Sequence, residues 1–262
     1  MRVGLLGSCR LCVDGWEFTT ESTEGTEAGS RADCESQPVC LNQEMISPLY
    51  PILDAGFLPP PGLAREERLG SLMAELLAAG VTLLQYRNKS GDEDEILDDA
   101  LVLRAAAPAG QCALILNDYP GLAVEAAFDG VHVGQQDIPA DLARILIGDK
   151  KMLGVSTHNP EQLAAAVLSS ADYVAIGPVF ATSTKQNPDP VVGLEGVRRA
   201  RAITKKPVVA IGGITLENCR AVVDAGADSV AVISAIFAPS LRADGRGETP
   251  GKIASDFFAK LR

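Results

Sequence analysis

Residues 171–177 read ADYVAIG, and closely similar phrases recur at residues 128–134 (FDGVHVG) and 227–233 (ADSVAVI). In each phrase an aspartate stands directly before a short apolar run that contains β-branched residues, a composition typical of a buried strand. The recurrence indicates that one strand-and-helix unit is used repeatedly along the chain.

Five more short apolar runs follow the same pattern, and alanine-rich helical stretches separate most of them. Ahead of the second run, Leu69, Leu72, Met73 and Leu76 are spaced as on one face of a helix, and Gly80 supplies the helix stop. The eight strands predicted in this way cover residues 49–53, 81–86, 113–116, 130–133, 152–155, 173–176, 208–211 and 229–233.

Eight short strands that alternate with helices over residues 45–262 predict an α/β fold, the (β/α)8 or TIM barrel, whose usual size is about 250 residues. A doubly wound open sheet is the alternative fold. No G-x-G-x-x-G motif follows an early strand, so the dinucleotide-binding version of that alternative has no support.

The composition bounds the class of protein. The chain has 262 residues, of which 47% are hydrophobic and 22% charged, as in ordinary globular proteins. Its 23 lysines and arginines against 34 acidic residues leave a formal net charge of −11, which argues against nucleic-acid or anionic-membrane partners. No apolar run approaches the ~20 residues of a membrane span, and residues 3–7 are too short for a secretory signal, so we expect a cytoplasmic protein.

Residues 1–44 are expected to be a poorly ordered or non-native N-terminal extension, with the barrel domain beginning at Met45. Residues 13–44 are rich in Ser, Thr, Gly and Glu and have no apolar period. Zinc binding by the four cysteines of this region is an alternative, but the spacing of the second pair is poor for a zinc site. These cysteines are Cys9, Cys12, Cys34 and Cys40; Cys112 and Cys219 lie in apolar or helical surroundings.

Polar side chains follow the second predicted strand. Active sites of (β/α)8 barrels form at the carboxyl ends of the strands, so these residues are candidates for function. Because strand side chains alternate, Gln85, Arg87 and Lys89 are expected to project to one side. Two cations and an amide would then share one small region.

Carboxylates follow the next two strands. Asn117 and Asp118 come directly after the third strand, and Gln135 and Asp137 lie in the loop after the fourth. Magnesium prefers oxygen ligands and is commonly held by one or two carboxylates together with substrate phosphates. Two carboxylates near two cations therefore predict a metal-bridged phosphate site.

The later strands end in hydroxyl groups, an ammonium group and glycines. Residues 182–185 (TSTK) after the sixth strand suit several anionic oxygens. Gly212 and Gly213 after the seventh strand, with Ile233 and Ser234 after the eighth, predict a phosphate site built from exposed backbone N–H groups.

The chain has two histidines, and each has a structural interpretation. His132 stands in the middle of a predicted strand and is expected to be a packed core residue. His158 is expected to cap the helix that starts near Asn159.

Seven motifs, taken together and in order, resemble the thiamine phosphate synthase family, and the resemblance extends from Leu49 to the C-terminus. They are QYRNK (85–89), ILND (115–118), VHVGQQD (131–137), GVSTH (154–158), GPVFATSTK (177–185), AIGGI (210–214) and VAVISAI (230–236). The departures are Ala181, where proline is frequent in the family, and the distinctive stretch 186–192.

The resemblance implies a (β/α)8 transferase that joins hydroxymethylpyrimidine diphosphate to a thiazole phosphate, with Mg2+, and releases diphosphate. It implies that Asp118 and Asp137 bind magnesium and that Arg87, Lys89 and Lys185 are catalytic. The residues implied to hold the pyrimidine diphosphate are Gln85, Arg87, Lys89, Asn117, Ser156 and Lys185, and those implied for the thiazole phosphate are Thr182, Thr184, Gly213, Ile233 and Ser234.

Two other functions remain open from the sequence. A thiazole tautomerase of the same superfamily would use His158 as acid or base, and a non-catalytic sensor would bind a thiazole or thiamine phosphate. Tautomer exchange does not need the diphosphate grip of Gln85, Arg87 and Lys89, which favours the synthase over the tautomerase. The expected partners are small molecules, and a homo-oligomer is compatible with the sequence.

Overall fold

The computed structural model describes residues 46–108, 110–182, 189–239 and 247–262. The predictions for residues 1–44, including their four cysteines, and those for Thr184 and Lys185 lie outside the described residues. Within the described ranges, none of the helices has the length and apolar character needed to cross a bilayer.

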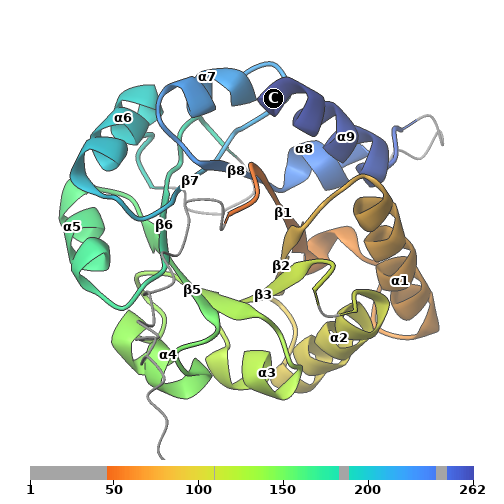
Figure 1. The fold of residues 1–262 in the computed structure, drawn as a ribbon. Coiled ribbons are helices and arrows are strands. Elements are labelled where there is room, and N and C mark those ends of the chain that lie inside the picture. The colour runs from red at the N-terminus through yellow and green to blue at the C-terminus, as the bar shows by residue number, and fades with distance from the viewer. Residues whose placement is uncertain (1–45, 109, 183–188, 240–246) are drawn as a thin grey trace, which may run out of the picture. The chain divides into compact units, whose positions relative to one another are not determined.

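Eight parallel strands form a closed barrel in which each strand pairs with the next and the last pairs with the first, so the predicted (β/α)8 fold is confirmed. Figure 1 shows the strands as the inner ring. They are β1 (Leu49–Asp54), β2 (Leu83–Arg87), β3 (Ala113–Asn117), β4 (Gly130–Val133), β5 (Met152–Thr157), β6 (Tyr173–Ile176), β7 (Val208–Ile211) and β8 (Ser229–Val232).

The helices surround the strands as an outer ring (Figure 1). A short 3-10 helix, η1 (Ala55–Phe57), follows β1. Two α-helices, α8 and α9, follow β8. The α-helices are α1 (Leu63–Ala78), α2 (Glu93–Ala106), α3 (Pro120–Glu125), α4 (Ala140–Ile147), α5 (Pro160–Leu168), α6 (Gly193–Ile203), α7 (Cys219–Asp224), α8 (Ser234–Phe237) and α9 (Pro250–Leu261).

The start of β2 differs from the prediction because Val81 takes part in the cap that follows α1. The Val81 N–H donates to Leu76 O and the Gly80 N–H donates to Leu77 O, both at 3.0 Å. Gly80 has a φ of +86°, which completes a Schellman motif at the helix end. The predicted helix stop at Gly80 is therefore confirmed, and the strand begins two residues later than predicted.

Several strands extend further at their carboxyl ends than their apolar runs. The parallel ladder continues through Asp54, Arg87, Asn117 and Thr157, which pair with neighbouring strands. Polar residues can stay in the ladder because backbone hydrogen bonds do not depend on the side chain. The strand ends therefore hold these polar side chains on rigid backbone.

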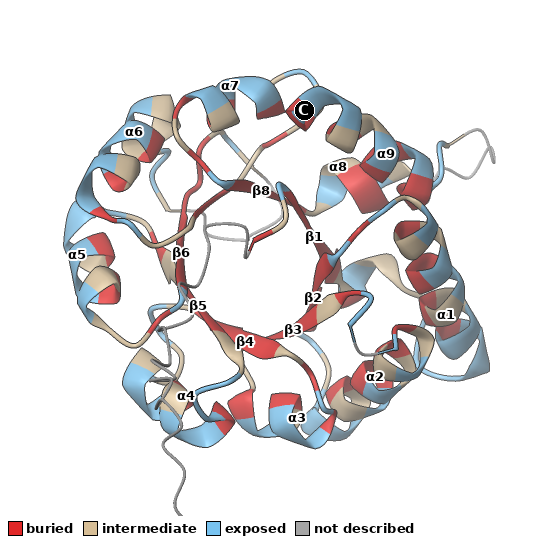
Figure 2. Ribbon diagram, in the orientation of Figure 1, coloured by how far each residue is buried: buried red, intermediate tan, exposed pale blue. Residues whose placement is uncertain are grey.

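Alternation of side chains along the strands produces two apolar cores. One lies between the strands and the helices and takes residues such as Leu53, Leu84 and Leu114. Figure 2 shows the strands buried and the helices buried on their inner faces only. The other core fills the barrel itself and consists of Ile46, Tyr50, Ile52, Leu83, Ile115, Tyr173, Ala175, Val209 and Ala231.

A buried polar cluster lies in the outer layer between α1 and α2. Arg65 forms ion pairs with Glu95 at 2.8 Å and with Asp99 at 2.6 Å, and it donates to the hydroxyl of Tyr86 on β2 at 3.2 Å. Burial raises the pKa of Asp99. Tyr86 points away from the barrel interior, so this cluster serves helix packing.

The aspartate of each repeated sequence phrase has the same role at the amino ends of the strands. Its carboxylate accepts the backbone N–H of the preceding strand and an arginine from the helix before that strand. The three sets are Asp129 with Leu114 N–H and Arg104 (2.8 and 2.9 Å), Asp172 with Leu153 N–H and Arg144 (2.7 and 2.6 Å), and Asp228 with Val208 N–H and Arg201 (2.7 Å each). A unit of two strands and two helices is therefore used three times.

We expect Asp172→Ala to lower the free energy of unfolding by about 1–3 kcal/mol, because it leaves the Leu153 N–H and the Arg144 guanidinium without their shared acceptor. Denaturant unfolding measures the change. Asp256→Ala is the matched control, since it removes only an exposed pair with Lys252 on α9 and should cost less than about 0.5 kcal/mol. Equal losses in both variants would contradict this role of Asp172.

Candidate active site

A cavity of about 1210 Å³ opens at the carboxyl ends of the strands, and all eight strands contribute to its lining. The fold therefore gathers every predicted site residue that the structure describes. These are Gln85, Arg87, Lys89, Asn117, Asp118, Asp137, Ser156, Thr182, Gly213, Ile233 and Ser234.

The two described cations of the site each contact a carboxylate. Arg87 at the end of β2 pairs with Asp54 at the end of β1, its neighbour in the ladder. Lys89, half-exposed just beyond β2, pairs with Asp118. Asp54 was not predicted as a site residue, although a charged residue directly after the run LYPIL was an available signal. Its second oxygen accepts the Gly56 N–H at 2.9 Å, which orients the carboxylate.

Asp118 is held in an unusual backbone conformation. Its φ is +71°, in the left-handed region that residues other than glycine rarely adopt, and its N–H donates to His132 O at 2.8 Å. Burial, followed by a hydrogen bond with Asp137, raises the pKa of Asp118 to about 6 against the opposing effect of Lys89. The two carboxylates therefore share one partly buried position.

Asp137 reaches that position through a tight loop after β4. Its Oδ2 accepts the Gly134 N–H at 2.7 Å, and a Cβ at Gly134 would lie 2.9 Å from the same oxygen. A larger residue at 134 would therefore push the Asp137 carboxylate out of this position. Asp118 and Asp137 meet as predicted, and they offer oxygen ligands only.

The floor of the cavity is polar, and two of its four side chains, those of Tyr50 and His132, were not predicted as site residues. Gln85, Tyr50, His132 and Ser156 line it. His132 is buried as expected of a core residue, but its Nε2 also contacts Ser156 Oγ at 2.8 Å. Burial lowers the pKa of His132 to about 4, against a smaller opposing effect of Asp137. The imidazole is therefore neutral at pH 7.

The glycine pair after β7 does more than turn the chain. Gly212 and Gly213 have φ values of +101° and +64°. A Cβ at Gly212 would lie 2.6 Å from Pro178 Cα, and one at Gly213 would lie 2.5 Å from Ala181 O. The glycines thus let the segment after β6 pack against the segment after β7. Nearby, Ile233 O accepts the Ile236 and Phe237 N–H groups of α8 at 3.2 Å each. The N–H groups of Ser234 and Ala235 come before them and have no acceptor within the helix, as at any helix start.

The predicted capping role of His158 is wrong. Asn159 is the N-cap of α5, and its side chain accepts the Gln162 N–H at 2.9 Å. The His158 ring instead donates from Nδ1 to Gly177 O at 2.7 Å, while its Nε2 lies 3.5 Å from Asp189 Oδ2. The shorter asparagine side chain suits the cap because it reaches the backbone of its own helix.

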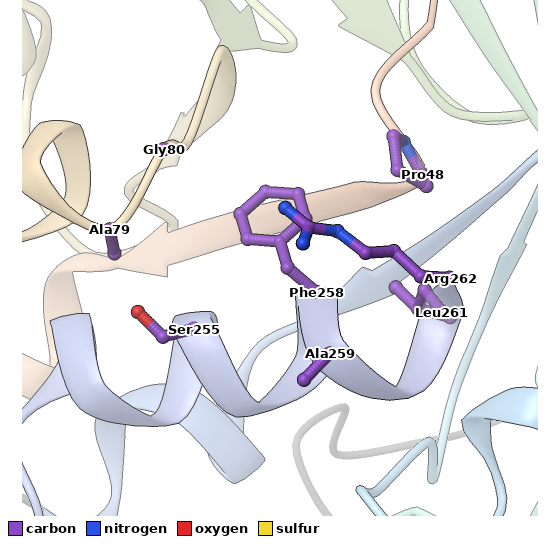
Figure 3. A pocket seen from close by; sticks show the side chains of 8 residues that line it. All are labelled: Pro48, Ala79, Gly80, Ser255, Phe258, Ala259, Leu261 and Arg262. Carbon is purple, nitrogen blue, oxygen red and sulfur yellow. The ribbon is translucent and has the colours of Figure 1, made fainter.

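A second cavity, of about 460 Å³, lies near the amino ends of β1 and β2 (Figure 3). Pro48, the end of α1 and the last turns of α9 line it. Among the described residues of its lining, Arg262 is the one charged side chain. The cavity lacks the convergent polar groups of the larger one.

Comparisons with known proteins agree on one family. Residues 49–236, which span all eight strands, match the family model described as thiamine monophosphate synthase. A thiamine-phosphate synthase of Koribacter versatilis is 56% identical over 187 residues, which cover 71% of this chain and 87% of the relative. One of Chloroflexus aurantiacus is 42% identical over 190 residues, which cover 72% and 85%.

A solved structure gives the same result. Thiamine phosphate pyrophosphorylase from Pyrococcus furiosus superposes on this chain with a TM-score of 0.67 at 30% sequence identity. The superposition covers 81% of this chain and 94% of that one.

The low pKa of His132 predicts how stability depends on pH. Between pH 6.5 and about 4 the unfolded chain binds a proton at His132 that the folded chain does not, so the free energy of unfolding falls as the pH falls, by about 3 kcal/mol from this group. Denaturant unfolding at several pH values should show this loss in the wild type and in His158→Gln, but not in His132→Gln. An equal pH dependence in all three proteins would contradict it.

Proposed function

This chain belongs to the thiamine monophosphate synthase family and is a transferase, and from that premise we propose that it joins hydroxymethylpyrimidine diphosphate to hydroxyethylthiazole phosphate with release of diphosphate. One observation carries the proposal. A single cavity brings the Arg87 and Lys89 cations and the Asp118 and Asp137 carboxylates to one side, and the glycine-rich segment around Gly213 to the other.

The balance of charge on the side of the cavity that holds Arg87 and Lys89 supports a requirement for a divalent cation. Arg87 and Lys89 stand against three carboxylates, those of Asp54, Asp118 and Asp137, so the described side chains carry excess negative charge. A bound diphosphate would add further negative charge. A bound divalent cation would reverse this local balance and make the side attractive to the leaving group.

Asp118 and Asp137 fit magnesium in this role. Both supply oxygen ligands, and within the described residues no cluster of three or more potential metal ligands exists, so water and phosphate oxygens would complete the coordination. The raised pKa of Asp118 reflects unfavourable burial of negative charge, which a cation would relieve. When bound, the ion supplies Lewis-acid stabilisation of negative charge on the departing diphosphate.

The cationic side chains of the site bind and orient the diphosphate. Arg87 and Lys89, joined by Lys185 from the loop after β6, hold diphosphate oxygens while the carbon–oxygen bond of the pyrimidine methylene breaks. Electron donation from the pyrimidine ring supports positive charge on that carbon, so no enzyme nucleophile is needed. Loss of one such preorganised contact commonly raises the barrier by ~2.7–4 kcal/mol.

The second substrate is placed for attack on the same carbon. Backbone N–H groups near Gly213, Ile233 and Ser234, with the hydroxyls of Thr182 and Thr184, hold the thiazole phosphate so that its ring nitrogen faces the pyrimidine. Holding both substrates in one cavity makes their reaction effectively unimolecular. Apolar walls exclude the water that would capture the carbon; they include Ile52, Ala175, Val209 and Ile211.

Other predictions from the sequence remain as they were. The cytoplasmic location, the absence of nucleic-acid and membrane partners, self-association and the N-terminal extension stay predictions. Within the proposed function the partners are the two small-molecule substrates.

We expect the full chain, incubated with both substrates and magnesium, to form thiamine phosphate, measured by mass spectrometry. EDTA should stop the reaction and added magnesium should restore it, because the excess carboxylate charge would then be unbalanced. Full activity in metal-free buffer would contradict the role given to Asp118 and Asp137. If the thiazole phosphate is isomerised but not coupled to the pyrimidine, the protein is a tautomerase. If a thiazole or thiamine phosphate binds but no reaction occurs, it is a sensor.

We expect Asp118→Asn to lower turnover roughly 10²–10³-fold. Stability should not fall, because the pKa of this carboxyl lies above its ordinary value and its ionised form therefore weakens the fold as the pH rises through about 6. Asp149→Asn, an exposed change outside the cavity, is the control for loss of one negative charge. Steady-state kinetics and thermal unfolding measure both effects, and unchanged turnover in Asp118→Asn would remove its assigned role.

A further inference from the structure

Five buried or part-buried side chains form a continuous hydrogen-bonded chain across the barrel. Tyr173 stands at its centre, fully buried and outside the cavity lining, whereas the other four reach the cavity. The contacts are Gln85 Nε2 to Tyr50 Oη (3.0 Å), Tyr50 Oη to Tyr173 Oη (3.0 Å), Tyr173 Oη to His132 Nδ1 (3.0 Å) and His132 Nε2 to Ser156 Oγ (2.8 Å).

Gly154 provides the space for the central contact. It is the register partner of His132 on one side and of Tyr173 on the other. A Cβ at Gly154 would lie 2.3 Å from Tyr173 Oη and 2.5 Å from His132 Nδ1. Any larger residue at 154 would therefore occupy the place where the phenol meets the imidazole, so the backbone of β5 is adapted to this contact.

Counting protons leaves the chain two possible directions. The Gln85 amide nitrogen only donates, so Tyr50 accepts from it, and its single O–H then either donates to Tyr173 or turns to the cavity and lets Tyr173 donate to it. The first direction keeps both phenol protons inside the chain, and in it Tyr173 donates to His132 Nδ1, which is then the bare ring nitrogen. The ring proton of His132 accordingly sits on Nε2 and is donated to Ser156.

The two ends of the chain face the cavity with opposite character. Ser156 Oγ accepts from His132, so its own O–H remains as a donor toward a ligand. Gln85 Oε1 has no hydrogen-bond partner among the described residues and is not one of the fully buried unpartnered atoms, so the cavity reaches it as an acceptor. The floor thus presents one donor, the Ser156 O–H, and one acceptor, Gln85 Oε1. The hydrogen-bonded chain links the two, so that a change of direction at one end changes the group offered at the other.

We propose that Tyr173 is a positioning residue that sets the tautomer of His132 and the orientation of the Gln85 amide, and thereby selects the donor and acceptor pattern of the pyrimidine ring. This inference rests on the proposed function for the identity of the ring. An aminopyrimidine offers a ring nitrogen to the Ser156 hydroxyl and an amino group to Gln85 Oε1. A ring with the reversed pattern, carbonyl in place of amino and N–H in place of bare nitrogen, sets its carbonyl oxygen against Gln85 Oε1 and gives the Ser156 O–H no acceptor.

The tautomer is measured without substrate by ¹H–¹⁵N spectra of the histidine rings in the full chain at neutral pH. The chain has two histidines, and His158→Gln assigns them. We expect His132 in the wild type to carry its proton on Nε2, and Tyr173→Phe to yield a mixture of tautomers. Tyr50→Phe should keep the Nε2–H form, because Tyr173 still donates to Nδ1.

Kinetics test selection of the ring. Tyr173→Phe and Tyr50→Phe should each raise KM for the pyrimidine diphosphate about five- to tenfold, the effect of one or two neutral hydrogen bonds, while KM for the thiazole phosphate changes less than about twofold. Tyr86→Phe is the matched control, since it removes a buried tyrosine hydroxyl from the outer layer and should alter neither KM nor the tautomer.

A wild-type His132 protonated on Nδ1 would overturn the proposal, as would a Tyr173→Phe protein with an unchanged tautomer and an unchanged KM. If Tyr173→Phe does not fold, the wild-type tautomer and the Tyr50→Phe kinetics decide. A wild type that shows the Nε2–H tautomer but forms no thiamine phosphate would instead refute the proposed function and leave the proton order standing.

Discussion

Closure of the parallel sheet, with β8 paired to β1, is the constraint on which the rest of the molecule depends. A closed sheet has no edge, and its strands all point the same way, so the polar residues that end each strand meet at one mouth. Residues as distant in sequence as Tyr50 and Ile233 thereby line one cavity.

Closure also buries polar groups in the barrel interior, where a polar group is costly unless it is hydrogen-bonded. Near the mouth, the interior side chains satisfy this requirement by hydrogen-bonding to one another from Gln85 to Ser156 through hydroxyls, an amide and an imidazole. Each hydroxyl has one proton, so the choice of donor at one end is transmitted to the other. The hydrogen bonds of the polar floor therefore share one direction, and this direction sets which donor and which acceptor face the ligand.

The architecture and most of the candidate site could be predicted from the sequence, because apolar runs locate strands and alternation directs side chains such as Gln85 and Arg87 to one side. Contacts between distant strands could not. Tyr50 and Tyr173 stand in apolar runs where an aromatic ring fits the pattern, and only the closed barrel shows their hydroxyls meeting, because β1 and β6 are not neighbours in the sheet. The pairing of Arg87 with Asp54 likewise depends on the register of β1 with β2.

The two ends of the barrel use the same residue types for different purposes, and the difference lies in how fully each carboxylate is satisfied. At the amino end, Asp172 accepts both a backbone N–H and an arginine, which fixes it in the fold. At the mouth, Asp118 shares its position with Asp137, and Lys89 opposes them from a half-exposed site. Charges that are poorly balanced within the protein are those that a ligand can rebalance. We therefore place the proposed function at the mouth, where the described side chains leave excess negative charge, and the stabilising pairs at the opposite end.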